Sequence, residues 1–358
     1  MKIISLCDGM SCGMIALKKL KINIQEYHAW EIDKYAIQTS QSNFPEIKQH
    51  GDIFKADFSV YKDADWLIGG TICTMWSISQ KSEKRETTAE GIGWDMFQQY
   101  VKALKQTKPK YFLYENNNSM SEEIKNSITK EFGFKPILVN SSLLSAQNRL
   151  RLYWVGVKDK NGNYQSANLE QPVDIGLTVG DILDTPLGKT NNTNVYYNKS
   201  KRIGLFPSLN GELKNSQGMR IYSTSGKSVT LMANGGGKGA KTGLYAVKVN
   251  SDKNEAKNTD EKIYKVKDKS ININDKLYPI ELSDGYYKIR KLTVSEAKRL
   301  QNIPEWYNFP VSDTQAYKML GSGWTCDVIS YLIIKTMEKS NEKMDNFKPR
   351  NSKAKIIF

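Results

Sequence analysis

The sequence predicts an α/β fold that combines a doubly wound, mostly parallel sheet with a second, smaller domain rich in β-strands. Residues 1–157 alternate short apolar runs with stretches of helical periodicity, which is typical of a parallel sheet covered by helices. From about residue 165 this periodicity fades, and short β-type runs appear among Gly, Asn and Thr. A length of 358 residues also fits two domains better than one.

Predicted strands and helices alternate through the first 157 residues. The strands are expected at 2–6, 27–30, 65–70, 110–115, 136–143 and 151–157. The helices are expected at 14–20, 33–43, 93–107 and 120–131. Because ligands of doubly wound sheets bind outside the carboxyl ends of the strands, the residues that follow these strands are the first candidates for a site.

The second half of the chain has a different pattern. β-type runs are expected at 219–223, 228–233 and 243–247, and helices return at 293–302 and 325–338. Residues 248–276 are rich in Lys, Asn and Asp and poor in apolar residues, so we expect an exposed insertion there. Residues 339–358 are polar and basic, and we expect them to be ordered only in part.

Composition narrows the class of protein. The 52 Lys and Arg exceed the 38 Asp and Glu, and the net charge of +14 favours a polyanionic partner, although a lysine-rich solvated surface would explain it equally well. No apolar run approaches the roughly 18 residues of a membrane span, so we expect a cytosolic protein. Four cysteines without a CxxC pair and only two histidines predict no metal site and no secreted disulfide framework, and they disfavour a Ser-His-Asp hydrolase.

The first candidate site is the glycine-containing turn 9–13 between the first strand and its helix. Glycines let the backbone approach a ligand, and a helix N-terminus attracts negative charge. Glu31 ends the next strand 18 residues past Gly13, where a carboxylate can bridge the two hydroxyls of a ribose. Asp52 follows the third segment and can accept from an adenine amino group. The pattern predicts an adenosine-containing cofactor, and a tight turn with a surface glutamate is the alternative.

The second candidate is Cys73, in the polar loop 69–77 that directly follows an apolar strand. This placement puts the thiol at the rim of the sheet, where a thiolate can act as a nucleophile if its setting is positive or dipolar. Taken alone, such a cysteine is more often a small buried apolar residue. Glu115, at the end of the strand 110–115, is a candidate acid, with a capping role as the alternative.

Two arginines form the next candidate, and a glycine-rich segment is rejected. Arg149 and Arg151 point to the same face of an extended chain, and they are two of only eight arginines, which favours fork-shaped donors over plain surface charge. Residues 235–242 differ from a phosphate-binding P-loop by Ala240. A P-loop must lead into a helix, whereas 243–247 is a predicted strand, so a hairpin that approaches a phosphate backbone is the better interpretation.

In order and spacing, these segments resemble the C5-cytosine DNA methyltransferases, both the bacterial and phage members and the mammalian de novo branch. The resemblance runs from residue 3 to about 157 and resumes at 288–335. The segments that carry it are LCDGMSCG, HAWEID, GGTICTMWS, YENNNSM, SAQNRLRLYW, RKLTVSEAKRLQNIP and MLGSGWTCDVI.

The resemblance implies a Rossmann-like fold, S-adenosyl-L-methionine (AdoMet) as cofactor and a set of site residues. The implied cofactor-binding residues are Cys7, Asp8, Gly9, Met10, Gly13, Glu31, Ile32, Asp52, Ile53, Ser322 and Trp324. In the implied reaction the Cys73 thiolate attacks C6 of cytosine, and Glu115 holds and protonates N3. Arg151 binds O2, and Arg149 supports the loop.

The resemblance also implies a division of the chain and its partners. We expect a first catalytic part at 1–165, a target recognition domain at 166–287, a returning catalytic segment at 288–340 and a basic tail at 341–358. The expected partner is double-stranded DNA, bound by a monomer in the cytoplasm of a bacterial or phage-infected cell, without a membrane. Whether a cognate restriction endonuclease exists is left open by the sequence.

Four positions depart from the family pattern. Ile72 replaces the usual proline before the nucleophile, Cys7 an aromatic residue, Asn117 a valine and Ser322 an asparagine. Activity could therefore be normal or reduced, or the enzyme could transfer a different group from a modified AdoMet. The other functions considered are a catalytically silent DNA-binding homologue, an RNA cytosine methyltransferase and a Rossmann enzyme for small molecules, which would leave the basic β-rich segment unexplained.

Overall fold

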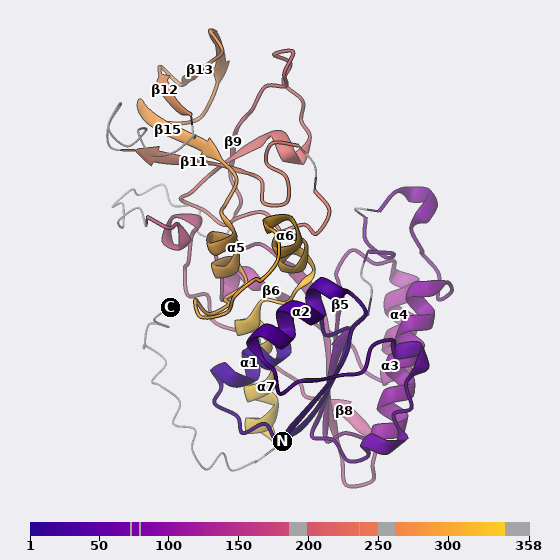
Figure 1. The fold of residues 1–358 in the computed structure, drawn as a ribbon. Helices are drawn as coiled ribbons and strands as arrows, with labels where there is room; N and C mark the ends of the chain where they lie inside the picture. Colours follow the sequence, from indigo (N-terminus) through magenta and orange to yellow (C-terminus); the bar gives the residue numbers. More distant parts are fainter. Residues whose placement is uncertain (72–73, 79, 186–198, 236, 250–261, 341–358) are drawn as a thin grey trace.

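The computed structural model describes residues 1–71, 74–78, 80–185, 199–235, 237–249 and 262–340, which form two sheets and the helices around them (Figure 1). The predicted tail 341–358, part of the predicted insertion at 248–276, and Ile72 and Cys73 lie outside these residues. Within the described part of the chain, no helix is both long and apolar enough to cross a membrane.

The first sheet confirms the predicted doubly wound, mostly parallel architecture. Its order is β3-β2-β1-β4-β5-β7-β6, with β8 paired to β7. β7 runs antiparallel to β5, β6 and β8, and the other pairs are parallel. The strands are β1 (Lys2–Leu6), β2 (Glu26–Trp30), β3 (Lys48–Gln49), β4 (Trp66–Gly70), β5 (Tyr111–Asn117), β6 (Ile137–Asn140), β7 (Leu150–Lys158) and β8 (Tyr164–Ser166).

Helices cover both faces of this sheet because its strands are apolar on both faces. Ile3 packs into the core shared with α1 and α7, whereas Ile4 packs into the core shared with α3 and α4. Figure 1 shows α1, α2 and α7 on one side and α3 and α4 on the other. The helices are α1 (Cys12–Lys19), α2 (Lys34–Asn43), α3 (Ile92–Thr107), α4 (Glu122–Phe132), α5 (Val294–Leu300), α6 (Asp313–Ser322) and α7 (Cys326–Lys339). Short 3-10 helices are η1 (Ile53–Lys55), η2 (Ser59–Tyr61), η3 (Ser82–Lys84), η4 (Ser141–Leu143), η5 (Val179–Ile182) and η6 (Gln217–Met219).

The second sheet has the order β14-β13-β12-β15-β11-β10-β9 and is antiparallel except for the β10–β11 pair. Its strands are β9 (Arg202–Leu205), β10 (Arg220–Ser223), β11 (Leu244–Val249), β12 (Ile263–Lys267), β13 (Ser270–Ile273), β14 (Lys276–Pro279) and β15 (Gly285–Arg290). Because β11 directly follows the glycine-rich segment, the rejection of a P-loop there is confirmed. The division at residues 166 and 287 stays a prediction.

Two predictions about the second half were wrong. The described part of the stretch 248–276 is not an exposed insertion, because β12 and β13 bury Tyr264, Val266, Ile271 and Ile273. Lys265 and Lys267 in β12 and Asn272 in β13 alternate with these buried residues and hide the period of two. Residues 228–233 do not form a strand. They run beside the segment 146–149, joined to it by a single bridge between Gln147 and Ser228 and by other hydrogen bonds.

The two histidines of the chain are hydrogen-bonded to each other at the β2–β3 edge of the first sheet. His28 Nδ1 lies 2.9 Å from His50 Nε2, and His28 Nε2 lies 2.9 Å from Glu26 Oε2. His50 stacks on Trp30 with ring centroids 4.6 Å apart. Burial lowers the pKa of both imidazoles, assisted by the charge of Lys48 and opposed at His28 by Glu26.

We expect acid to destabilise the protein through this pair. The unfolded histidines titrate near pH 6.5, above the folded ones, so the unfolded state binds more protons as the pH falls below about 6.5. The stability that the neutral pair contributes is present above that pH and lost below it. Urea unfolding at pH 7.5 and 5.5 should show a larger loss for the wild type than for a His28→Gln/His50→Gln variant. Equal losses, or NMR titration of either histidine above pH 6.5, would contradict the expectation.

Candidate active site at the carboxyl end of the first sheet

The turn after β1 is shaped by a buried aspartate. Asp8 Oδ1 accepts hydrogen bonds from Ser5 Oγ at 2.6 Å and Tyr27 Oη at 2.7 Å, and Oδ2 accepts one from Ser11 Oγ. Burial raises the pKa of Asp8 to about 6. The pKa of the neighbouring Cys7 thiol rises to about 12, chiefly through burial and also through the charges of Glu31 and Asp8. Cys7 therefore stays a thiol at neutral pH and is no nucleophile.

Glu31 lies beside this turn, as predicted from the strand ends. Its Oε2 accepts from the Gly9 backbone N at 2.8 Å, and its Oε1 accepts from the backbone N of Ile32 and of Asp33. Gly9 has a φ of +57°, and a Cβ built on it would meet no atom within 4 Å, so the space above the turn is open.

The edge beyond Glu31 offers apolar side chains beside a carboxylate. The Ile32 side chain is 73% exposed, and Phe54 is 42% exposed. Asp52 lies between them in sequence, and its Oδ1 caps η1 by accepting from Phe54 N at 2.9 Å. These groups suit AdoMet. The fixed carboxylate of Glu31 can accept from the ribose hydroxyls, the turn at Gly9 is open, and the exposed apolar side chains can contact the adenine.

Three of the remaining predicted cofactor residues, Met10, Gly13 and Ile53, are buried, whereas Ser322 is exposed. Met10 is buried, and its carbonyl accepts from Tyr307 Oη at 2.6 Å. A Cβ on Gly13 would lie 2.4 Å from Ile68 Cδ1, so this glycine lets α1 pack against β4. Ile53 is buried in η1, and the Ser322 hydroxyl donates to the carbonyls of Lys318 and Met319 at the end of α6. A direct contact of these residues with AdoMet stays a prediction.

The predicted acid is held between two donors at the end of β5. Arg151 Nε lies 3.0 Å from Glu115 Oε1, and Trp324 Nε1 donates to Glu115 Oε2 at 2.9 Å. Glu115 is only 7% exposed, so its carboxyl group is surrounded by these partners and not by bulk water. The structure thus brings Glu115 and Arg151 together, as the sequence predicts. It places Trp324, which the resemblance assigns to the cofactor, against the acid.

The loop that carries Cys73 begins beside this acid. Gly70, three residues before Cys73, pairs with Glu115 between β4 and β5. A Cβ on Gly70 would lie 2.8 Å from Glu115 Oε2, so only glycine leaves room for the carboxylate there. Cys73 itself lies outside the described residues. Its proximity to Glu115 is therefore an expectation from the position of Gly70.

Arg149 connects three segments that are distant in sequence. Its Nη2 donates to Gly323 O at 2.9 Å and to Gly321 O at 3.1 Å, and its Nη1 donates to Leu231 O at 3.3 Å. The guanidinium is buried, with 3% of the residue exposed. It therefore joins the start of β7 to the segment before the second sheet's β11 and to the turn between α6 and α7. A supporting role for Arg149 agrees with this geometry.

Lys227 is a supporting residue that the sequence did not indicate. It is fully buried, and its Nζ donates to Ser142 O at 2.6 Å and to Ser145 O at 3.1 Å, with Asp174 Oδ1 at 3.7 Å. Burial lowers its pKa, and Asp174 opposes the shift. Lys227 thus fixes the loop that precedes Arg149. Among many lysines, nothing in the sequence marks one that is buried.

Replacing Lys227 by methionine should destabilise the protein. Methionine keeps most of the aliphatic volume but leaves the buried carbonyls of Ser142 and Ser145 without this donor, and Asp174 without this cation. We expect a loss on the order of 3 kcal/mol in urea unfolding. Lys214→Met is the matched control, because Lys214 is 63% exposed and its ion pair among the described residues is with an exposed Glu212, and it should stay within about 0.5 kcal/mol. Equal effects of both substitutions would refute the role of Lys227.

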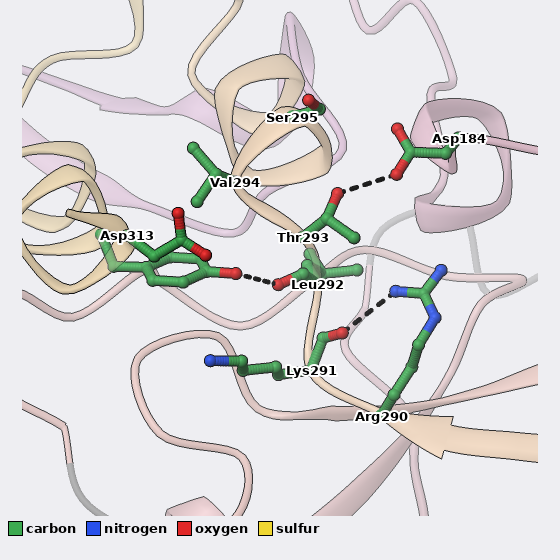
Figure 2. A pocket seen from close by; sticks show the side chains of 9 residues that line it. Asp184, Arg290, Lys291, Leu292, Thr293, Val294, Ser295 and Asp313 are labelled. Carbon is green, nitrogen blue, oxygen red and sulfur yellow. Dashed lines mark hydrogen bonds between the residues drawn. The ribbon is translucent and has the colours of Figure 1, made fainter. Parts of the chain in front are cut away.

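A separate cavity of about 300 Å³ lies where β15 leads into α5 (Figure 2). It is lined by Asp184, Arg290, Lys291, Leu292, Thr293, Val294, Ser295, Asp313 and Tyr317, none of which is a predicted site residue. Arg290 forms two hydrogen bonds of 2.7 Å with the buried Glu296, and Thr293 Oγ1 donates to Asp184. These polar groups hold the junction together, and the cavity is separate from the candidate active site.

The first sheet and its covering helices give the chain a Rossmann-like fold, with the clamped carboxylate at the end of β5. More narrowly, the chain belongs to the C-5 cytosine-specific DNA methylase family, whose family model matches residues 1–339. It is therefore a methyltransferase with AdoMet as its methyl donor. No metal-binding group of three or more His, Cys, Asp or Glu occurs among the described residues.

The curated relatives agree with this assignment, and solved structures share the fold. The chain is 28% identical to type II methyltransferase M1.ScrFI of Lactococcus lactis subsp. cremoris, over 95% of this chain and 80% of that protein. It is 26% identical to type II methyltransferase M.HhaI of Haemophilus parahaemolyticus, over 93% of each chain. The methyltransferase EhMeth of Entamoeba histolytica has a similar fold, with a TM-score of 0.60 at 15% identity over 95% of this chain and 99% of that one.

Proposed function

We propose that the protein is a sequence-specific DNA cytosine-5 methyltransferase that acts on a cytosine flipped out of double-stranded DNA. The observation that carries the proposal is the position of Glu115. Arg151 and Trp324 hold its carboxylate, and its backbone pairs with Gly70, where the loop that carries Cys73 begins. A carboxyl group fixed next to a nucleophile loop is what addition to a pyrimidine ring requires. The type II methyltransferases among the relatives support DNA as the substrate.

The proposed reaction passes through a covalent bond between Cys73 and the cytosine ring. The Cys73 thiolate forms a bond to C6, and the electrons of the C5–C6 double bond move into the ring as Glu115 delivers a proton to N3. AdoMet, when bound, supplies an electrophilic methyl group to C5. S-adenosyl-L-homocysteine is the product left from AdoMet. A water molecule then takes the C5 proton, the C5–C6 double bond re-forms as the Cys73 thiolate leaves C6, and N3 returns its proton to Glu115. Arg151 binds O2, in this proposal, and so orients the ring.

Flipping the base costs a few kcal/mol, which contacts in the pocket must offset. The proposed ribose and adenine contacts are Glu31 and Asp52, with Gly9 giving access to the turn.

The recognition of the DNA sequence is assigned to the second sheet and its loops. We expect a monomer in the cytoplasm of a bacterial or phage-infected cell, with a cognate restriction endonuclease as an optional partner.

Sequencing the DNA of cells that express the protein tests this function. Bisulfite or nanopore sequencing should show 5-methylcytosine in one short sequence context, absent from cells that carry Cys73→Ala. Purified protein should transfer labelled methyl groups from AdoMet to duplex DNA and not to tRNA. Labelling of tRNA alone would establish an RNA methyltransferase instead. DNA binding without any transfer would establish a silent homologue.

A further inference from the structure

The carboxylate of Glu115 receives one charged and one neutral donor. Arg151 Nε contacts Oε1, and the indole Nε1 of Trp324 contacts Oε2. The side chain of Arg151 is largely buried, Trp324 is half-buried, and the side chain of Glu115 is only 9% exposed. Each oxygen therefore has a fixed partner, and the plane of the carboxylate is set by the protein before any base arrives.

Trp324 is itself held by the turn between α6 and α7. Gly323 O accepts hydrogen bonds from Arg149 Nη2 at 2.9 Å and from Gln301 Nε2 at 3.1 Å. The next residue after Trp324 is also fixed, since Thr325 Oγ1 donates to Gln301 Oε1 at 2.7 Å. The backbone on both sides of the indole is thus anchored, so the direction of its N–H is determined.

The same turn packs on the cofactor side of the first sheet. A Cβ on Gly323 would lie 3.1 Å from both Cys12 Sγ and Met10 Cε, which belong to the turn and helix after β1. These contacts form a closed chain of residues. Arg149 and Arg151 lie at the same end of β7, and Arg149 donates to Gly323. The residue after Gly323, Trp324, donates to Glu115, which pairs with Arg151. The acid and the cofactor turn are thereby connected through Trp324.

We propose that Trp324 is a positioning residue for Glu115, whose indole N–H orients the acid for proton delivery. The inference rests on the proposed function above, since it needs Glu115 to protonate a cytosine. A neutral donor suits this task better than a second cation, because it fixes Oε2 without adding a charge that would favour the ionised carboxylate. An aromatic residue without an N–H would keep the packing and lose the orientation.

Steady-state kinetics of Trp324→Phe with AdoMet and duplex DNA test the inference. Phenylalanine removes the N–H and keeps a ring, so kcat should fall roughly 10- to 100-fold, with KM for AdoMet and for DNA changed less than about threefold. Trp324→Arg supplies a charged donor, and the alkaline limb of its kcat–pH profile should lie at lower pH than that of the wild type. Trp306→Phe is the matched control, because Trp306 is a 52% exposed tryptophan on the surface, and it should match the wild type.

The outcomes separate the two proposals. A wild-type protein without transfer to DNA defeats the proposed function. An active wild type with an unchanged kcat in Trp324→Phe defeats the positioning role of Trp324. A raised KM for AdoMet with an unchanged kcat at saturation also defeats it and makes Trp324 a cofactor contact only. The urea unfolding midpoint of Trp324→Phe, expected close to that of the wild type, separates a kinetic effect from loss of fold.

Discussion

Cys73→Ala should abolish methyl transfer, lowering kcat by at least about 10³-fold, because the variant cannot form the bond to C6 that makes C5 nucleophilic. Binding of duplex DNA should persist, since salt-dependent contacts with the phosphates do not involve the thiol. Single-turnover transfer of labelled methyl groups measures the first quantity, and DNA titration at fixed salt measures the second.

Cys326→Ala is the control for this experiment. Cys326 is buried at the start of α7, and burial raises the pKa of its thiol well above the ordinary value, so it cannot replace the nucleophile. We expect the control to keep its rate of transfer while losing some stability through the small cavity. Transfer by Cys73→Ala at a rate near that of the wild type would show that another group, or no covalent step at all, carries the reaction.

Glu115→Gln should have the second largest effect, a fall in kcat of roughly 10²- to 10⁴-fold, the usual contribution of a general acid. Glutamine has nearly the same shape, but its one amide oxygen can accept from either Arg151 or Trp324 and not from both, and it has no proton to deliver to N3. The partly buried guanidinium of Arg151 also loses its ionic partner. The rate of methyl transfer at saturating AdoMet and DNA measures the change.

The matched control is Glu122→Gln, at the exposed start of α4. Its side chain is 75% exposed and, within the part of the chain that the structure describes, pairs with Lys125 one helical turn away, so the rate should not change. A Glu115→Gln variant with the rate of the wild type would remove Glu115 from the chemistry and leave it a structural partner of Arg151.

Much of the first sheet could be predicted because its strands are buried on both faces. Apolar runs such as 65–70 and 110–115 can be recognised from the local sequence alone. In the helices between such strands, apolar residues recur every three to four positions. The order of strand ends then brings Gly9 to Glu31 and Arg151 to Glu115, since side chains at one edge of a sheet meet.

The rest depends on contacts that no local pattern contains. The Trp324–Glu115 hydrogen bond joins residues 209 positions apart, and the bond from Lys227 to Ser142 spans 85 positions. The strands β12 and β13 were missed because their exposed positions are polar, Lys265 and Lys267 in β12 and Asn272 in β13, so the buried alternate residues are few. Helix α6 (Asp313–Ser322) was missed as well.

The most direct test of a covalent cytosine-5 mechanism is the mass of the protein after incubation with AdoMet and duplexes that contain 5-fluorocytosine in the methylated sequence context. Fluorine replaces the C5 proton that must leave, so the adduct cannot resolve. The wild type should gain the mass of the bound strand through a bond that survives denaturation and maps to Cys73, and Cys73→Ala should gain none. A wild type that methylates cytosine yet shows no such adduct, or an adduct on any other residue, would contradict the mechanism.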